Sequence, residues 1–225
     1  MDWNEVLKNK EEVVINIGGG SDCHPKKNYI NHVAVDLRAI ENWGISHDLT
    51  KGIPLPDNSI ERIISDHFFE HVSKESVINI FKECYRILKP GGNMRVAVPD
   101  YNHPREVKHI EKGVDLNHKD HIWLPTIEEF KPIIEESDFL SYDFRQYWTH
   151  EGFYGQELDY SNGYIKRTPE NDKRNRKNKL YDYIDCYFKS FFHIIIRTIS
   201  RKKIFLSSIR GNSHRATSIV VDMWK

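Results

Sequence analysis

The sequence has few cysteines, no net charge and no long apolar run, and each of these absences narrows the class of protein. Its three cysteines, Cys23, Cys84 and Cys186, are scattered over 225 residues. No pair has the spacing of a metal site, and an odd number argues against a disulfide framework, so we expect a reducing, cytoplasmic setting. Lys and Arg together number 33, as do Asp and Glu. This balance gives no sign of a nucleic-acid partner.

The chain also lacks the apolar stretches that target or anchor a protein. The first residues, MDWNEVLKNKEE, are charged and have none of the apolar core of a signal peptide. No window reaches the length of a transmembrane helix, so we expect no membrane span. A length of 225 residues suits one domain with its own core, and we expect residues 1–225 to form a single domain.

Apolar runs and amphipathic periods alternate along the chain. The apolar runs predict strands at residues 13–17, 32–37, 60–67, 94–100, 140–148 and 216–225. Helices are predicted at 74–88, ended by the KPGG turn, at 126–139, with Thr126 as N-cap and Glu129 completing a capping box, and at 181–199. Such alternation is typical of a parallel, doubly wound sheet. The last strand has no helix before it, so we expect it to join the sheet antiparallel.

Three consecutive glycines, Gly18, Gly19 and Gly20, follow the first predicted strand. Glycine allows positive φ and a close approach of the backbone to a ligand, although a tight turn is the simpler explanation. Asp36 ends the next strand, where a carboxylate can accept hydrogen bonds from ribose hydroxyls or simply cap a helix. The two features at this spacing favour a nucleoside ligand. The turn is not GxGxxG, and GxxxxGK[ST] is absent, so neither a dinucleotide nor a P-loop is expected.

Five segments occur in the order VVINIGGG, VAVDLR, HDLTKGIPLPDNSIERIISDHFFEHV, ILKPGG and MRVAVPD. Together they resemble the class I S-adenosylmethionine-dependent methyltransferases over residues 13–100, with SDFLSYDF and ATSIVVDMW similar to the last two strands of that family. GYIKRTPENDKRN and the final SIVVDM further resemble predicted methyltransferases of surface-glycan biosynthesis. The resemblance implies an α/β fold with a Rossmann-like, seven-stranded and mostly parallel sheet, the last strand antiparallel and helices on both faces. Residues 149–215 would form an insertion between the last two strands that caps the cleft.

The resemblance implies S-adenosylmethionine as the cofactor and O-methylation of a sugar hydroxyl, in a glycan or glycan precursor, as the reaction. The cofactor-binding residues that it implies are Asn16, Gly18, Gly19, Gly20, Asp36, Leu37, Asp48, Leu49 and His67. The glycines would face the methionine part and Asp36 the ribose. Asp48 and Leu49 would bind the adenine, and His67 would lie near the methyl group. Asn16 stands where many members have an acid, which leaves a non-catalytic cofactor-binding module as an alternative, beside methyl transfer to another small molecule.

A hydroxyl acceptor needs a base to take its proton, and histidine titrates in the suitable range. The segment NHKDHIW, residues 117–123, follows the fourth predicted strand of the sequence, where the family places substrate residues. We expect His118 to be the base, with His121 and Asp100 behind it. The alternative is a set of loop histidines that are solvated or hydrogen-bonded.

A divalent ion held by Asp100, His118 and His121 is a further alternative, since some sugar methyltransferases use magnesium. Magnesium prefers oxygen ligands, and Asp100 is the one obvious carboxylate near these histidines. We therefore expect no metal.

Substrate contacts are expected from His71, Arg167 and Glu170. The last two lie in the charged run 163–178, which is either a solvated loop or a lid whose arginines grip a phosphate or carboxylate of the acceptor. Residues 187–210 mix bulky apolar side chains with basic ones. Packing in the core is favoured for them over docking on an acidic membrane surface or on a partner such as a glycosyltransferase.

Overall fold

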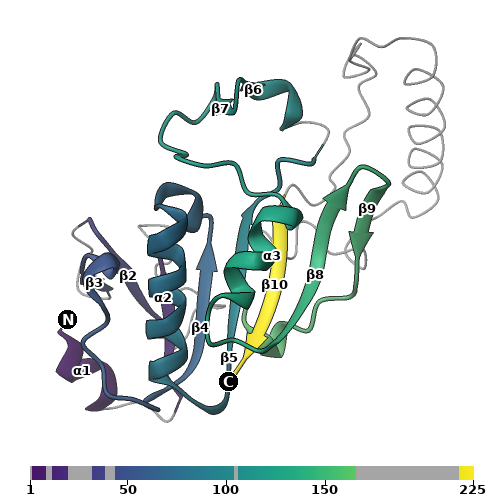
Figure 1. The fold of residues 1–225 in the computed structure, drawn as a ribbon. Helices are drawn as coiled ribbons and strands as arrows, with labels where there is room; N and C mark the ends of the chain where they lie inside the picture. Colours follow the sequence, from purple (N-terminus) through teal and green to yellow (C-terminus); the bar gives the residue numbers. More distant parts are fainter. Residues whose placement is uncertain (1, 9–11, 20–31, 39–43, 104–105, 166–217) are drawn as a thin grey trace, which may run out of the picture.

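The computed structural model describes residues 2–8, 12–19, 32–38, 44–103, 106–165 and 218–225. Their main feature is an eight-stranded sheet in the order β3-β2-β1-β4-β5-β10-β8-β9 (Figure 1). Its strands are β1 (Val14–Ile17), β2 (His32–Asp36), β3 (Gly44–Ser46), β4 (Ile60–Asp66), β5 (Leu88–Pro99), β8 (Ser141–Thr149), β9 (Gly152–Gly155) and β10 (Ser218–Trp224). A separate hairpin joins β6 (Ile110–Glu111) to β7 (Val114–Asp115).

The predicted fold class is confirmed. Strands β3, β2, β1, β4 and β5 are parallel, and β10 lies antiparallel between β5 and β8. The sheet has eight strands rather than seven because β9 folds back on β8, with Thr149 opposite Gly152.

The described helices are α1 (Trp3–Lys8), α2 (Lys74–Ile87) and α3 (Ile127–Glu135). Helix α2 begins where the Ser73 side chain accepts a hydrogen bond from the Ser76 N–H. Thr126 stands at the N-cap of α3 as predicted, but its side chain makes no capping hydrogen bond. Glu129 instead accepts a hydrogen bond of 2.9 Å from Lys74 Nζ. The predicted capping box is therefore wrong, because a contact between helices takes its carboxylate.

The KPGG segment lies inside a strand rather than in a turn. Helix α2 ends at Ile87, and β5 begins at the next residue with a register shift against β4. A Cβ added at Gly92 would lie 2.9 Å from the Glu61 carbonyl oxygen. The glycine therefore allows β5 to approach β4 closely at this irregularity.

The two faces of the sheet are covered differently by the described residues. Helices α2 and α3 pack on one face (Figure 1), where Phe81 and Phe130 join the large core cluster with strand residues such as Ile15. On the other face Leu158 and Ile165 pack together with β-strand residues that alternate with those of the first face. The segment 156–165 thus serves as the described cover of the second face.

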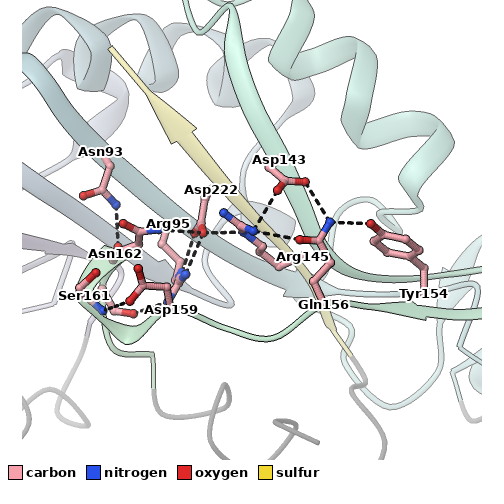
Figure 2. A network of polar contacts seen from close by, with 11 residues as sticks. Asn93, Arg95, Asp143, Arg145, Tyr154, Gln156, Asp159, Ser161, Asn162 and Asp222 are labelled. Carbon is pink, nitrogen blue, oxygen red and sulfur yellow. Dashed lines mark hydrogen bonds and ion pairs between the residues drawn. The ribbon is translucent and has the colours of Figure 1, made fainter.

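A buried ion pair ties β10 to its neighbours (Figure 2). Asp222 accepts hydrogen bonds from Arg95 Nε at 2.6 Å and Nη2 at 2.8 Å, and both side chains are fully buried. Asp222 also accepts from Arg145 Nε of β8 at 2.9 Å. Arg95 Nη1 donates to the Gly163 carbonyl oxygen at 2.6 Å. One network therefore joins β5, β10, β8 and the segment 156–165.

Much of the predicted insertion, together with the charged run and the helix expected at 181–199, lies outside the described residues. The same holds for the membrane or glycosyltransferase docking considered for residues 187–210. Among the residues that the structure describes, no helix has both the length and the apolar character of a membrane span.

Candidate active site

The glycine turn is packed against the end of a neighbouring strand. Gly18 follows β1 with φ of 68°, and its N–H donates to the Val35 carbonyl oxygen at 2.8 Å. A Cβ added to Gly18 would lie 2.5 Å from Cβ of Phe68, just after β4. Glycine is therefore required for both conformation and space. Gly19 is buried, whereas Gly20 lies outside the described residues.

Asn16 and Asp36 come from the two strands that meet beside this turn. Asn16 is 2% exposed, on the face of β1 opposite to Ile15 and Ile17. Asp36 ends β2 and is partly exposed, and its Oδ1 accepts the Arg38 N–H at 2.9 Å. The next side chain, Leu37, is 71% exposed. The carboxyl end of β2 thus presents a carboxylate beside an exposed apolar side chain.

Asp48 and Leu49 have local roles in a 3₁₀ turn. Asp48 Oδ1 accepts the Thr50 hydroxyl at 2.6 Å and the Thr50 N–H at 3.1 Å, and these bonds lower the pKa of Asp48. Leu49 is 4% exposed and belongs to the core. The adenine contacts expected of both residues stay predictions.

His67 follows β4 in an unusual backbone conformation, with φ of 56°. This is costly for a residue other than glycine. Its ring is fixed from two sides, since Nε2 lies 2.8 Å from Ser218 Oγ and Nδ1 lies 3.5 Å from Glu70 Oε1. His67 therefore stands at the carboxyl edge of the sheet, and the position near the methyl group expected of it stays a prediction.

Two hydrogen bonds dock residues 118–123 on the turn Phe69–His71. Trp123 Nε1 donates to the Phe69 carbonyl oxygen at 2.8 Å, and the Ile122 N–H donates to the Glu70 carbonyl oxygen at 3.0 Å. The docking brings the His121 ring to 4.8 Å from the His71 ring. We call Glu70, His71, His118 and His121 the histidine cluster. Figure 1 shows the segment that carries β6 and β7 above the carboxyl ends of β4 and β5.

A tyrosine and a carboxylate support His121 from behind. Its Nδ1 lies 2.6 Å from the Tyr101 hydroxyl and 3.2 Å from Asp115 Oδ2, and Tyr101 donates its own proton to Asp115. His118 stacks on His121 at 4.7 Å, with an interplanar angle of 16°. The His118 N–H donates to Asp115 Oδ1 at 3.1 Å. His118 is exposed and the His121 side chain is 9% exposed, so His118 forms the outer layer.

Burial and neighbouring groups set the protonation states of His121, Tyr101 and Asp115, which lie behind His118. Burial lowers the pKa of His121, and His71 and His118 lower it further. Burial and the hydrogen bond to Asp115 raise the pKa of Tyr101. Burial alone would raise the pKa of Asp115, but hydrogen bonds from Tyr101 and two backbone N–H groups hold it below its ordinary value. At neutral pH we expect ionised Asp115, protonated Tyr101 and neutral His121.

Asp100 is not directed at the histidines, which corrects the grouping expected from the sequence. It is fully buried, and its carboxylate accepts the Trp148 N–H at 2.6 Å and the Asn102 N–H at 3.0 Å. Burial raises the pKa of Asp100 to about 7 despite these bonds. Asp100 therefore ties the end of β5 to β8, and Asp115 is the carboxylate that lies beside His121 Nδ1.

Of the residues expected to contact the substrate, the structure describes one and leaves two outside the described residues. His71 belongs to the histidine cluster, with Nδ1 3.1 Å from the Asp120 carbonyl oxygen. Arg167 and Glu170 lie outside the described residues. Sequence reasoning missed the roles of Tyr101 and Asp115. The one signal for Tyr101 was its position next to the end of a strand.

Comparisons with known proteins find a similar domain and similar folds. Residues 25–96 match a family model described as a methyltransferase domain. A structure of a SAM-dependent methyltransferase from Archaeoglobus fulgidus is similar with a TM-score of 0.54 and 16% identity, over 99% of this chain and 90% of that chain. A search of curated proteins finds no match.

A second similar structure is a phosphoethanolamine N-methyltransferase from Haemonchus contortus in complex with phosphomonomethylethanolamine and S-adenosylhomocysteine. Its TM-score is 0.50 at 12% identity, over 99% of this chain but 52% of that chain. This chain therefore spans about half the length of that relative. This chain thus shares its fold with these two methyltransferase structures, and residues 25–96 match a methyltransferase domain.

Proposed function

We propose that the protein transfers the methyl group of S-adenosylmethionine to a sugar hydroxyl, in a glycan or a glycan precursor. The observation that carries this proposal is the exposed imidazole of His118, stacked on a supported His121 at the carboxyl edge of the sheet. Ligands of open α/β sheets bind at this edge. A hydroxyl acceptor needs a proton acceptor there, which an exposed imidazole can supply near neutral pH.

The residues at the carboxyl edge fit the cofactor. Gly18 brings a bare backbone turn to the end of β1, where the amino-acid part of the cofactor would lie. The Asp36 carboxylate would accept hydrogen bonds from the ribose hydroxyls, and the exposed Leu37 offers an apolar surface for the adenine. The cofactor supplies a methyl group on a sulfonium, so the protein has mainly to align the partners.

In this proposal His118 takes the proton of the acceptor hydroxyl. Stacking on His121 sets the plane of its ring, and the bond from its N–H to Asp115 fixes its backbone. The imidazolium that forms would be balanced by Asp120, which has a carboxylate oxygen within 4.8 Å of a His118 ring nitrogen. Tyr101 acts through His121, and Asp115 acts through His121 and the His118 backbone, so both are positioning residues.

The surroundings of His118 suit a sugar. Three apolar side chains on the same segment are exposed, Val114 by 55%, Leu116 by 51% and Ile122 by 60%. A sugar combines hydroxyls with apolar C–H faces, so polar groups beside apolar ones match its two kinds of surface. Arg167 and Glu170 are proposed, from the sequence, to bind a charged group of the acceptor.

Calorimetry with S-adenosylmethionine tests the first step. Asp36→Ala should weaken binding by about tenfold or more, since hydrogen bonds to a charged group contribute about 1.5–3 kcal/mol. The matched control is Asp159→Ala, because Asp159 accepts the Ser161 N–H at 2.9 Å just as Asp36 accepts the Arg38 N–H. Equal affinities for both variants would refute the ribose role of Asp36.

A transfer assay tests the acceptor. Sugars, nucleotide sugars and phosphoethanolamine are offered with labelled cofactor, and we expect methylation of a sugar hydroxyl. Exclusive transfer to an amine, as the name of the Haemonchus relative describes for that protein, would refute O-methylation. Cofactor binding without any transfer would point to a non-catalytic module.

A further inference from the structure

We infer that Glu70, His71 and His121 form a binding site for a divalent transition-metal ion of the zinc type. Each of these residues has one ligand atom within 4.8 Å of those of the other two. Glu70 Oε1 lies 4.0 Å from His71 Nε2 and 3.9 Å from His121 Nε2. The site adds to the proposed methyl transfer, and metal binding can be measured without S-adenosylmethionine.

Hydrogen bonds on the far side of each ring set the tautomers. His71 Nδ1 faces the Asp120 carbonyl oxygen, which can only accept, so Nδ1 carries the proton. Tyr101 gives its proton to Asp115, so His121 Nδ1 must be the donor toward these two oxygens. When Nδ1 is the nitrogen that holds the proton, the lone pair of each ring is on Nε2, which is the nitrogen that lies toward Glu70.

Two imidazole lone pairs and a carboxylate oxygen therefore converge on one point. Their mutual repulsion becomes attraction when a cation lies between them. The contacts of Nδ1 with Asp115 and Asp120 are also those of metal-binding histidines, whose other ring nitrogen usually donates to a carboxylate or carbonyl oxygen. The geometry thus has both the ligands and the groups that orient them.

The donor set favours a transition-metal ion over magnesium. Two imidazoles and one carboxylate, with a fourth position open, are the ligands of a catalytic zinc site, whereas magnesium prefers oxygens. Ligands of a tetrahedral zinc site are about 3.4 Å apart for bonds of about 2.1 Å. The observed 3.9 and 4.0 Å need only small side-chain movements to reach this geometry.

A neighbouring group, His118, Asp120 and His121, competes for the same ion. His118 and Asp120 are both exposed, whereas Glu70 is fully buried. A buried carboxylate attracts a cation more strongly because water screens it less. The Glu70 site is therefore the stronger one.

The open position would face an acceptor, and this role rests on the proposed function. Glu70 follows Phe68 by two residues, and Phe68 packs on the Gly18 turn. A bound zinc-type ion would polarise the acceptor hydroxyl and favour loss of its proton, toward His118, as metal ions do for bound water.

The experiment titrates zinc into the chelator-treated full chain by calorimetry, with cobalt absorption as a second readout of histidine ligation. We expect one ion per chain. His71→Ala and His121→Ala should each weaken binding by more than about 100-fold, and Tyr101→Phe by about 10–100-fold, as for other residues that orient a ligand. His118→Ala and the exposed His150→Ala should stay within about threefold of the parent.

Two outcomes would overturn the inference. The cluster is not a metal site if the parent binds zinc no more tightly than the His71→Ala/His121→Ala double variant, with both folded by circular dichroism. The ligand assignment is wrong if His118→Ala costs as much as His71→Ala. Titration of the same samples with S-adenosylmethionine separates these failures from failure of the proposed function.

Discussion

Replacing Asp222 with asparagine tests the network that holds the antiparallel strand in place. Asp222 of β10 and Asp143 of β8 lie opposite each other in the sheet, and both contact Arg145. Asp222 is fully buried, whereas the side chain of Asp143 is 40% exposed. The same substitution at the two positions therefore differs mainly in burial and in the partner Arg95, which contacts Asp222.

The structure predicts very different losses for the two substitutions. Asp222→Asn leaves the buried guanidinium of Arg95 without a carboxylate, and breaking a buried pair costs about 3–5 kcal/mol. Arg145 keeps Asp143 in that variant, so the cost arises at Arg95. Asp143→Asn removes a partly solvated pair while Asp222 remains, and exposed pairs contribute less than about 1 kcal/mol.

Urea unfolding of the parent and both variants measures the difference, provided that the denaturant slope is unchanged. The double variant Arg95→Met/Asp222→Leu should recover most of the stability, since apolar replacement of a buried pair is often neutral. Equal losses for Asp222→Asn and Asp143→Asn would refute the reasoning. So would a double variant that is less stable than Asp222→Asn.

Three further predictions concern the carboxyl edge of the sheet. Gly18→Ala should cost about 2–5 kcal/mol and weaken cofactor binding, because the new Cβ meets Phe68 and the backbone has a φ of 68°. Gly113→Ala, with φ of 79° and no neighbour within 4 Å, should cost only about 1–2 kcal/mol of backbone strain in the same unfolding assay. Since the pKa of Asp100 rises from 3.8 to about 7 on folding, its contribution to stability is complete at low pH and is lost as pH rises to about 7. As the pH rises from 3.8 to about 7, the urea concentration at the unfolding midpoint should therefore decrease less for Asp100→Asn than for the parent. Trp123→Phe should lower the rate of methyl transfer by a larger factor than it lowers the equilibrium constant for folding in urea. The reason is that it removes the bond to Phe69 that docks residues 118–123 on the turn Phe69–His71.

The alternation of apolar runs and amphipathic helices was enough to predict the sheet and its antiparallel last strand. The edge strands β3 and β9 escaped prediction because three or four residues carry too little periodicity. The capping box at Thr126 was wrong because Lys74, distant in sequence, attracts Glu129. Local patterns thus predicted most of the helices and strands, while contacts between these elements determined the edge strands and the cap of α3.

The sequence predicted only those parts of the candidate site whose residues lie close together in the chain. His118 and His121 are three residues apart, and one turn brings them together. The direction of Asp100 depends on Trp148 in a distant strand, so sequence proximity to a strand end misled its assignment. Asp115 contacts His121 within a loop where its carboxylate also accepts the His118 N–H and the Tyr101 hydroxyl, and no periodic pattern in the sequence signals such a loop.

Transfer of a labelled methyl group from S-adenosylmethionine to a sugar acceptor tests the central claim most directly. The parent protein and His150→Ala, whose side chain is 75% exposed, should methylate the same hydroxyl at similar rates. His118→Ala should bind the cofactor normally but transfer about 10²–10⁴-fold more slowly, which is the usual contribution of a general base. Unchanged transfer by His118→Ala would contradict the assigned base, and no transfer by the parent to any sugar would contradict the proposed function.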